Sequence, residues 1–157
     1  MPKEYSCVKR TKKAFENALV ELSEDMPINK ITVKKLCEKA ELSRNAFYFH
    51  YSDINALISD IESGIVNRAK ELISNIDELG YPRNVYASVE GLIEIFDSQK
   101  DTCIMLFDKT TNSVVKTLSD LFCEYNYKFY EQYHPVSNRV GYEFFYMFLS
   151  SGFYGLI

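Results

Sequence analysis

Two groups of polar side chains in the first third of the chain have the chemistry to contact nucleic acid. They are Thr32, Lys34 and Lys35 in the first group and Ser43, Arg44 and Asn45 in the second. Arginine can form two hydrogen bonds with guanine, and asparagine can form two with adenine. Lysine neutralises the charge of a phosphate. Serine and threonine cap helix starts, where free backbone N–H groups attract phosphate. The two groups therefore predict a surface that contacts double-stranded DNA.

Tyr48 and His50 follow the second group and have two interpretations. In the first, Tyr48 bonds a phosphate and His50 supports or touches the DNA backbone. In the second, both are half-buried packing residues whose polar ends are satisfied within the protein. The basic residues over 9–13 are also ambiguous, because they could form an arm toward DNA or only keep the first helix soluble.

Three helices are needed to position these side chains. Apolar residues at helical spacing predict a first helix over 9–24, which ends before Pro27. A short second helix begins after Thr32, and a third covers 44–51 after the cap Ser43. A supporting helix followed by two short helices and a tight turn between them is the helix-turn-helix arrangement. The second helix of the pair fits the major groove.

The segment over 31–57, ITVKKLCEKAELSRNAFYFHYSDINAL, resembles the DNA-binding signature of TetR/AcrR transcriptional regulators. In that family a threonine opens the second helix, an Ala-Gly-hydrophobic-Ser turn follows, and the third helix ends in Phe-Tyr-x-His-Phe before Lys and Leu. The residues that match this order are Thr32, Ala40, Leu42, Ser43, Phe47, Tyr48, His50, Tyr51 and Leu57. A weaker resemblance points to the dihydroxyacetone-kinase activator group within the family.

Two positions depart from the family pattern. Glu41 replaces the turn glycine, which would cost about 1 kcal/mol if the backbone there needs a positive φ. Ile54 replaces the lysine that usually meets a phosphate, so that contact is lost unless the neighbouring Asn55 partly replaces it.

Charge and helix pattern divide the chain into a head over 1–52 and a body over 53–157. The head holds 10 Lys and Arg against 7 Asp and Glu, whereas the body holds 8 against 15. A basic head suggests a polyanionic partner, although short segments also differ by a few charges through chance. Further helices are predicted over 53–79, 84–96, a short stretch from Asp101, 112–133 and 138–157. We therefore expect an all-α protein, with a helix-turn-helix head and a helical effector-binding and dimerisation body.

Aromatic residues are concentrated in the body, with 17 of 23 after residue 80. The family resemblance implies a ligand pocket there and a homodimer formed by the last two helices. The candidate pocket residues are Phe107, Phe122, Tyr125, Phe129, Tyr142 and Phe145. They would suit a small apolar or aromatic effector. The alternative is that these rings pack the core and the dimer interface, as an aromatic stripe at helical spacing more often does.

Several classes of function are excluded by what the sequence lacks. It has no nucleotide-binding or nucleophile-elbow glycine motif, and its two histidines have no metal-ligand spacing, so we expect no enzyme, cofactor or metal. Four distant cysteines, no secretory leader and no membrane-length apolar run predict a cytoplasmic protein. The expected function is a DNA-binding repressor that a ligand releases from its operator. The alternative is a co-activator or adaptor whose body binds a partner protein.

Overall fold

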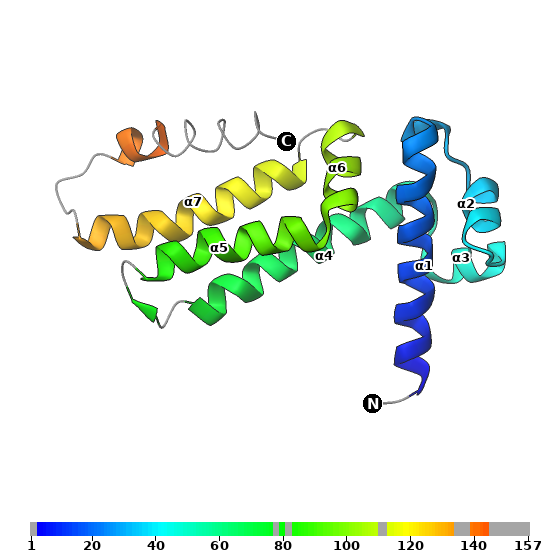
Figure 1. The fold of residues 1–157 in the computed structure, drawn as a ribbon, viewed down its shortest axis with the longest axis horizontal. Helices are drawn as coiled ribbons and strands as arrows, with labels where there is room; N and C mark the ends of the chain where they lie inside the picture. The colour runs from blue at the N-terminus through cyan, green and yellow to red at the C-terminus, as the bar shows by residue number, and fades with distance from the viewer. Residues whose placement is uncertain (1–2, 77–78, 81–82, 110–112, 134–138, 145–157) are drawn as a thin grey trace. The chain divides into compact units, whose positions relative to one another are not determined.

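The computed structural model describes residues 3–76, 79–80, 83–109, 113–133 and 139–144. All regular structure in these ranges is helical, which confirms the predicted all-α class (Figure 1). The contacts divide the chain into two compact units. The first unit holds Met1–Gly64 and Asp101–Lys109, and the second holds Ile65–Lys100 and Thr110–Ile157. These units are defined by contacts within the fold. The division into a DNA-binding head and an effector-binding body at residue 52 is a division by function, and it stays a prediction.

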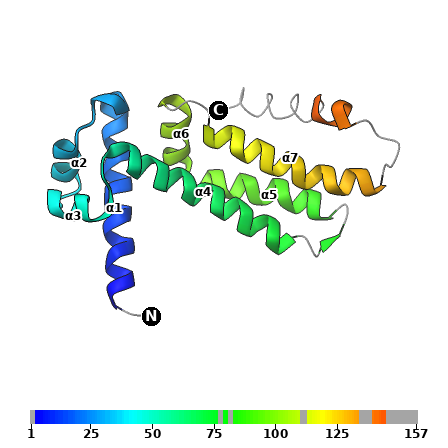
Figure 2. The same ribbon diagram turned by 180° about the vertical axis from the view of Figure 1, so that it is seen from behind.

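The first unit is built around three helices from the start of the chain. They are α1 (Lys3–Asp25), α2 (Val33–Lys39) and α3 (Arg44–His50), with the short 3-10 helix η1 (Ile28–Lys30) after α1. Helix α1 contacts both α2 and α3, which also contact each other, and both views show the pair beside α1 (Figures 1 and 2). The first turns of α4 (Ile54–Ile76) and most of α6 (Lys100–Lys109) complete the unit.

Side-chain caps fix the starts of the two short helices, as predicted. The Thr32 hydroxyl accepts a hydrogen bond from the Lys35 N–H at 3.3 Å, and the Ser43 hydroxyl accepts one from the Ala46 N–H at 3.1 Å. Because each cap satisfies an otherwise unpaired donor, it selects the residue at which the helix begins. The predicted starts of α2 and α3 are confirmed.

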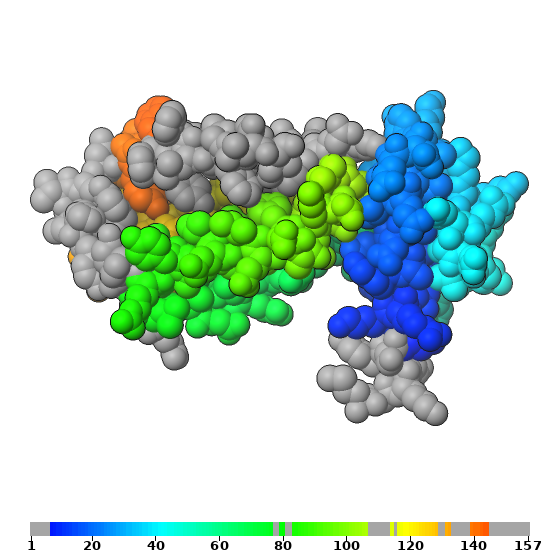
Figure 3. Space-filling model, viewed as in Figure 1, coloured from blue at the N-terminus to red at the C-terminus, as the bar shows by residue number. Residues whose placement is uncertain are grey.

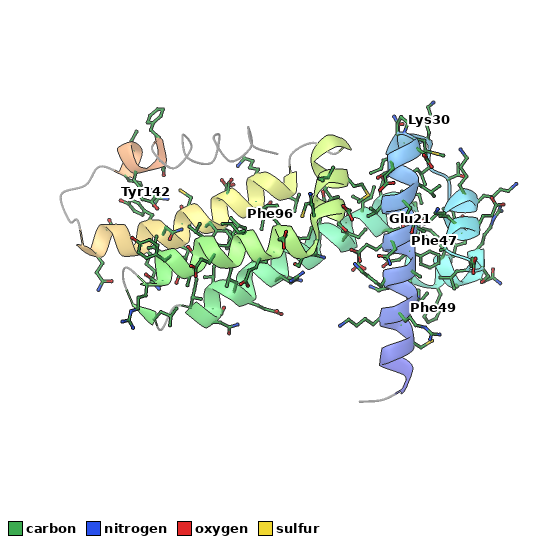
Figure 4. The ribbon with its side chains drawn as sticks, viewed as in Figure 1. Glu21, Lys30, Phe47, Phe49, Phe96 and Tyr142 are labelled. Carbon is green, nitrogen blue, oxygen red and sulfur yellow. The ribbon has the colours of Figure 1, made fainter. Side chains whose placement is uncertain are left out.

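The core of the first unit joins α3 to α1. The rings of Phe15 and Phe47 are fully buried and meet edge to face, with centroids 5.3 Å apart. Figure 4 shows Phe47 on the side of α3 that meets α1. Leu36 of α2 and Leu57 of α4 are also fully buried. Burial of such side chains stabilises the fold by about 1.5–3 kcal/mol each, so α3 is held by its inner face.

The second unit holds the remainder of α4, α5 (Arg83–Ser98) and α7 (Ser113–Tyr133), which lie side by side in both views (Figures 1 and 2). Tyr125 of α7 and Ile76 of α4 are buried together, with Leu72, Ile73 and Ala87 packed against them. Residues 139–144 are also helical, and Arg139 forms ion pairs with Glu124 and Glu143.

Three predicted helix starts were wrong. Helix α1 begins at Lys3 rather than at residue 9, because its first turns lie before the apolar stripe that marked it. Helix α5 begins at Arg83 rather than at residue 84, and Asn84 is buried in its first turn, where its Oδ1 accepts from the Val85 N–H at 2.9 Å. Helix α6 begins at Lys100, one residue before the predicted start at Asp101.

In the ranges that the structure describes, no helix is long and apolar enough to cross a membrane.

Candidate nucleic-acid interface

Helix α3 has a buried inner face and an exposed outward face. Phe47 and the C-cap residue Tyr51 are buried, one turn apart, on the inner side. The exposed residues are Arg44, Asn45, Tyr48 and Phe49. Successive helical residues are rotated by about 100°, so Phe49 lies about 200° around the helix from Phe47. Phe49 and Asn45, which is one turn earlier, therefore occupy the centre of the outward face.

Helix α3 carries a positive charge in its first turn and no negative charge. Arg44 and Asn45 are exposed in its first turn, and the sequence RNAFYFH contains no acidic residue. The Arg44 guanidinium is close enough to Cys37 of α2 to influence its thiol. Burial raises the pKa of Cys37, and the charge of Arg44 opposes that rise. Arg44 thus lies near the junction of α2 and α3, on the side open to solvent.

The basic residues of α2 are exposed as well. The ammonium of Lys34 lies 3.9 Å from the Glu38 carboxylate, and both side chains are about two-thirds exposed. A solvated pair of this kind contributes about 0.2–1 kcal/mol, so a stronger anion can displace it. The Lys35 Nζ lies 3.5 Å from the Met26 sulfur. Figure 3 shows α2 and α3 forming a continuous cyan surface beside α1.

The capping hydroxyls of Thr32 and Ser43 have capacity for another partner. Both side chains are exposed, and each cap uses only a lone pair of its oxygen. The hydroxyl proton can therefore be donated to a further acceptor, such as a phosphate oxygen. Both residues are structural caps, and capping does not prevent the predicted phosphate contact.

The structure separates the environments of Tyr48 and His50. Tyr48 is 58% exposed, although its ring meets the edge of Phe47 at a centroid distance of 5.5 Å. His50 is half-buried between Phe49 and Tyr51, with ring centroids at 4.9 and 6.1 Å. The exposure of Tyr48 favours its predicted phosphate contact, whereas the packing of His50 is compatible with both interpretations.

A polar cluster at the end of α3 ties the helix to α1 and α4. The Tyr51 hydroxyl donates to the Asp60 carboxylate at 2.8 Å, and Lys12 donates to the same oxygen at 2.9 Å. Burial and the bond to Asp60 raise the pKa of Tyr51. Burial works against ionisation of Asp60, but the hydrogen bonds from Lys12 and Tyr51 and the charges of Lys12 and His50 outweigh it and lower its pKa. Lys12 is therefore engaged within the protein.

The sequence interpretation missed one residue of the candidate interface. Phe49 lies in the last turn of α3 and is 80% exposed, and Figure 4 labels it below that helix. Its position two residues after the buried Phe47 could have revealed it, because that spacing turns a helical side chain to the opposite face.

The predicted pocket residues lie in different surroundings. Phe122 and Tyr125 of α7 are buried, and Tyr125 packs in the core with Ile76. Tyr142 is half-buried, with its ring 5.1 Å from that of Tyr127 (Figure 4). The remaining candidates, Phe107, Phe129 and Phe145, lie outside the side chains that the structure describes.

Comparison with known proteins gives a partial similarity. No family model matches the chain. It is similar to an uncharacterised HTH-type transcriptional regulator of Bacillus subtilis (strain 168), YxbF, with 34% identity over 68 residues. The match covers 41% of this chain and 18% of that protein, so the chain spans less than a fifth of this relative in the matched region. The similarity supports the class of helix-turn-helix regulators at a coarse level.

Proposed function

We propose that this chain is a sequence-specific, double-stranded DNA-binding transcriptional regulator of the TetR/AcrR type, in which α3 enters the major groove. One observation carries the proposal: the first turn of α3 exposes Arg44 and Asn45, the helix carries no acidic residue, and Phe47 and Tyr51 anchor its inner face. A helix held in this way can present side chains to base edges. The similarity to an HTH-type regulator supports the same class.

The exposed residues have separate roles in this proposal. Arg44 and Asn45 contact base edges, because their fork-like side chains match guanine and adenine. Lys34 and Lys35 contact phosphates, as do the hydroxyls of Thr32, Ser43 and Tyr48. His50 supports the backbone contact from its half-buried position. In this division α2 positions the protein and α3 reads the sequence.

The test begins with selection of bound duplexes from a random pool. Arg44→Ala should cost about 1–3 kcal/mol on the selected site and relax preference at one base position. Lys34→Ala should weaken all duplexes about equally and reduce the salt slope by about one unit. Tyr48→Phe should act like Lys34→Ala but more mildly. If Arg44→Ala weakens all sequences equally, Arg44 contacts only the backbone; if no variant matters, the head does not bind DNA this way.

The regulation we propose is release by a ligand. The protein would act as a homodimer through the helices predicted over 112–133 and 138–157, of which residues 112, 138 and 145–157 lie outside the described ranges. A small apolar or aromatic effector would bind the body. The effector would favour a spacing of the two heads that cannot span successive major grooves. Sedimentation should show a dimer at micromolar concentration. A monomer there, or no thermal shift in a broad ligand screen, would count against this mechanism.

A second candidate function, an adaptor that binds a partner protein, is favoured by an exposed apolar stripe on α5. This α5 stripe consists of Tyr86, Val89 and Ile93, which are 70%, 53% and 53% exposed. Three exposed acidic residues, Glu90, Glu94 and Asp97, form an acidic edge along it. A second copy would bring like charges together, so the occupant we propose is a basic amphipathic helix of another protein.

The α5 stripe can be tested with a synthetic amphipathic helical peptide of leucine and lysine. It should bind the chain, and Ile93→Ser and Glu94→Lys should each weaken binding. A control peptide with glutamate in place of lysine should not bind. Equal binding of both peptides would contradict a site selected by charge.

A further inference from the structure

We propose that Phe49 reads the 5-methyl group of a thymine in the major groove, an inference that rests on the proposed DNA-binding function. Phe49 lies at the centre of the outward face of α3, one turn after Asn45, and is 80% exposed. If the outward face enters the groove, these two side chains reach its floor.

The chemistry of Phe49 restricts what it can contact there. A phenylalanine ring forms no conventional hydrogen bond, so it gains affinity by covering apolar surface. The hydrogen-bonding groups of all four base pairs line the major groove, but only thymine presents an apolar methyl group. The ring also meets the half-buried His50 edge to face, with interplanar angle 86° and centroids 4.9 Å apart. This contact limits the positions that the ring can adopt.

The surroundings of Phe49 favour a nucleic acid over an apolar protein surface. Arg44 and Asn45 share the exposed part of α3, and the helix carries no acidic side chain. The α5 stripe, by contrast, has an acidic edge that would repel phosphates. An exposed aromatic ring beside a cation and an amide can combine apolar contact with hydrogen-bonded reading of the neighbouring base.

The experiment deletes the methyl group and the ring separately. The chain over residues 1–157 is measured on the duplex selected from the random pool and on copies in which one thymine at a time is replaced by deoxyuridine. At one position, the replacement should weaken the unaltered protein about fourfold, the value of one buried methyl group. Phe49→Ala should weaken binding to the thymine duplex by at least as much and should make that position indifferent to uracil.

Two controls separate this inference from the function on which it rests. Tyr48→Phe should keep the sensitivity to uracil, and Phe49→Leu should keep part of it. Circular dichroism should show that Phe49→Ala folds, since its side chain is exposed. If Arg44→Ala abolishes sequence preference but uracil weakens Phe49→Ala and the unaltered protein equally, only the role of Phe49 is overturned. If no duplex is selected at all, both proposals fall.

Discussion

Each compact unit has a helix that exposes large apolar side chains, α3 in the first and α5 in the second, but the charges beside these side chains are opposite. On α3, exposed Tyr48 and Phe49 share the surface with Arg44 and Asn45. On α5, the exposed stripe runs along an acidic edge. A phosphate backbone attracts the first surface and is repelled by the second. Exposed apolar area alone therefore does not identify a partner, whereas the charge beside it separates nucleic acid from a basic protein segment.

The two helices also differ in how they are anchored. The inner face of α3 is fixed by Phe47 in the core and by Tyr51 in its bond to Asp60. Helix α5 is held by close approach, because an ideal Cβ placed on the buried Gly91 would lie 2.5 Å from the δ carbons of Leu72. A helix that must present side chains in register to bases needs the first kind of support, since small rotations would displace every contact.

The largest expected effect compares two phenylalanines on α3. Phe47→Ala should destabilise the first unit by about 3–5 kcal/mol, because it removes a fully buried ring that packs on Phe15. Phe49→Ala should change stability by less than about 0.5 kcal/mol, since that ring is 80% exposed. Guanidinium denaturation followed by circular dichroism measures both. Equal effects would show that the two faces of α3 are wrongly assigned.

A smaller effect is expected from the polar cluster at the end of α3. Asp60→Asn should cost about 1 kcal/mol at pH 7, because a neutral amide is a weaker partner for Tyr51, while water screens the loss of the ion pair with the 39% exposed Lys12. Since folding lowers the pKa of Asp60, its ionised form stabilises the protein above its ordinary pKa of 3.8, and this stability is lost as the pH falls through the lowered value.

The free energies of unfolding of the unaltered protein and of Asp60→Asn should therefore converge as the pH falls below about 4. Urea denaturation between pH 3 and 7 measures this. As a control, Asp53→Asn should change stability little, because asparagine can also cap α4 by accepting the Ala56 N–H. A loss for Asp60→Asn that is the same at every pH would indicate a packing effect instead of a charge effect.

Features of the fold and of the candidate interface could be predicted from the sequence where neighbouring residues determine them. The starts of α2 and α3 followed from Thr32 and Ser43, because capping is decided within three residues. The cluster of Lys12, Tyr51 and Asp60 could not be predicted, because its members come from separate elements and Lys12 is 48 positions from Asp60. The exposure of Phe49 could have been predicted from its helical position relative to Phe47. It was missed because the family pattern has no fixed residue at that position.

Two glycines in similar helix interiors should respond in opposite directions to the same change. Gly64→Ala in α4 should stabilise the protein by about 1 kcal/mol, because alanine favours helix and an added Cβ meets nothing within 4 Å. Gly91→Ala in α5 gains the same propensity but forces Leu72 to move, so we expect a net loss of about 1 kcal/mol. Thermal unfolding measures both. A gain at both positions would show that Leu72 adapts without cost.

The smallest expected effect concerns the turn between α2 and α3. Glu41 has φ of 54°, and its N–H donates to the Glu38 carbonyl while the Leu42 N–H donates to the Cys37 carbonyl, the pair of bonds that ends a helix in a left-handed residue. Glycine adopts this conformation without a steric penalty. It loses more backbone entropy on folding than glutamate does, and this offsets part of the gain. Glu41→Gly should therefore stabilise the first unit by about 0.5–1 kcal/mol and leave DNA preference unchanged. Glu41→Ala removes the same carboxylate but keeps the Cβ, so it should give no such gain. If both variants stabilise the protein equally, the cost at Glu41 comes from its charge beside the candidate interface, and the backbone of the turn is not strained.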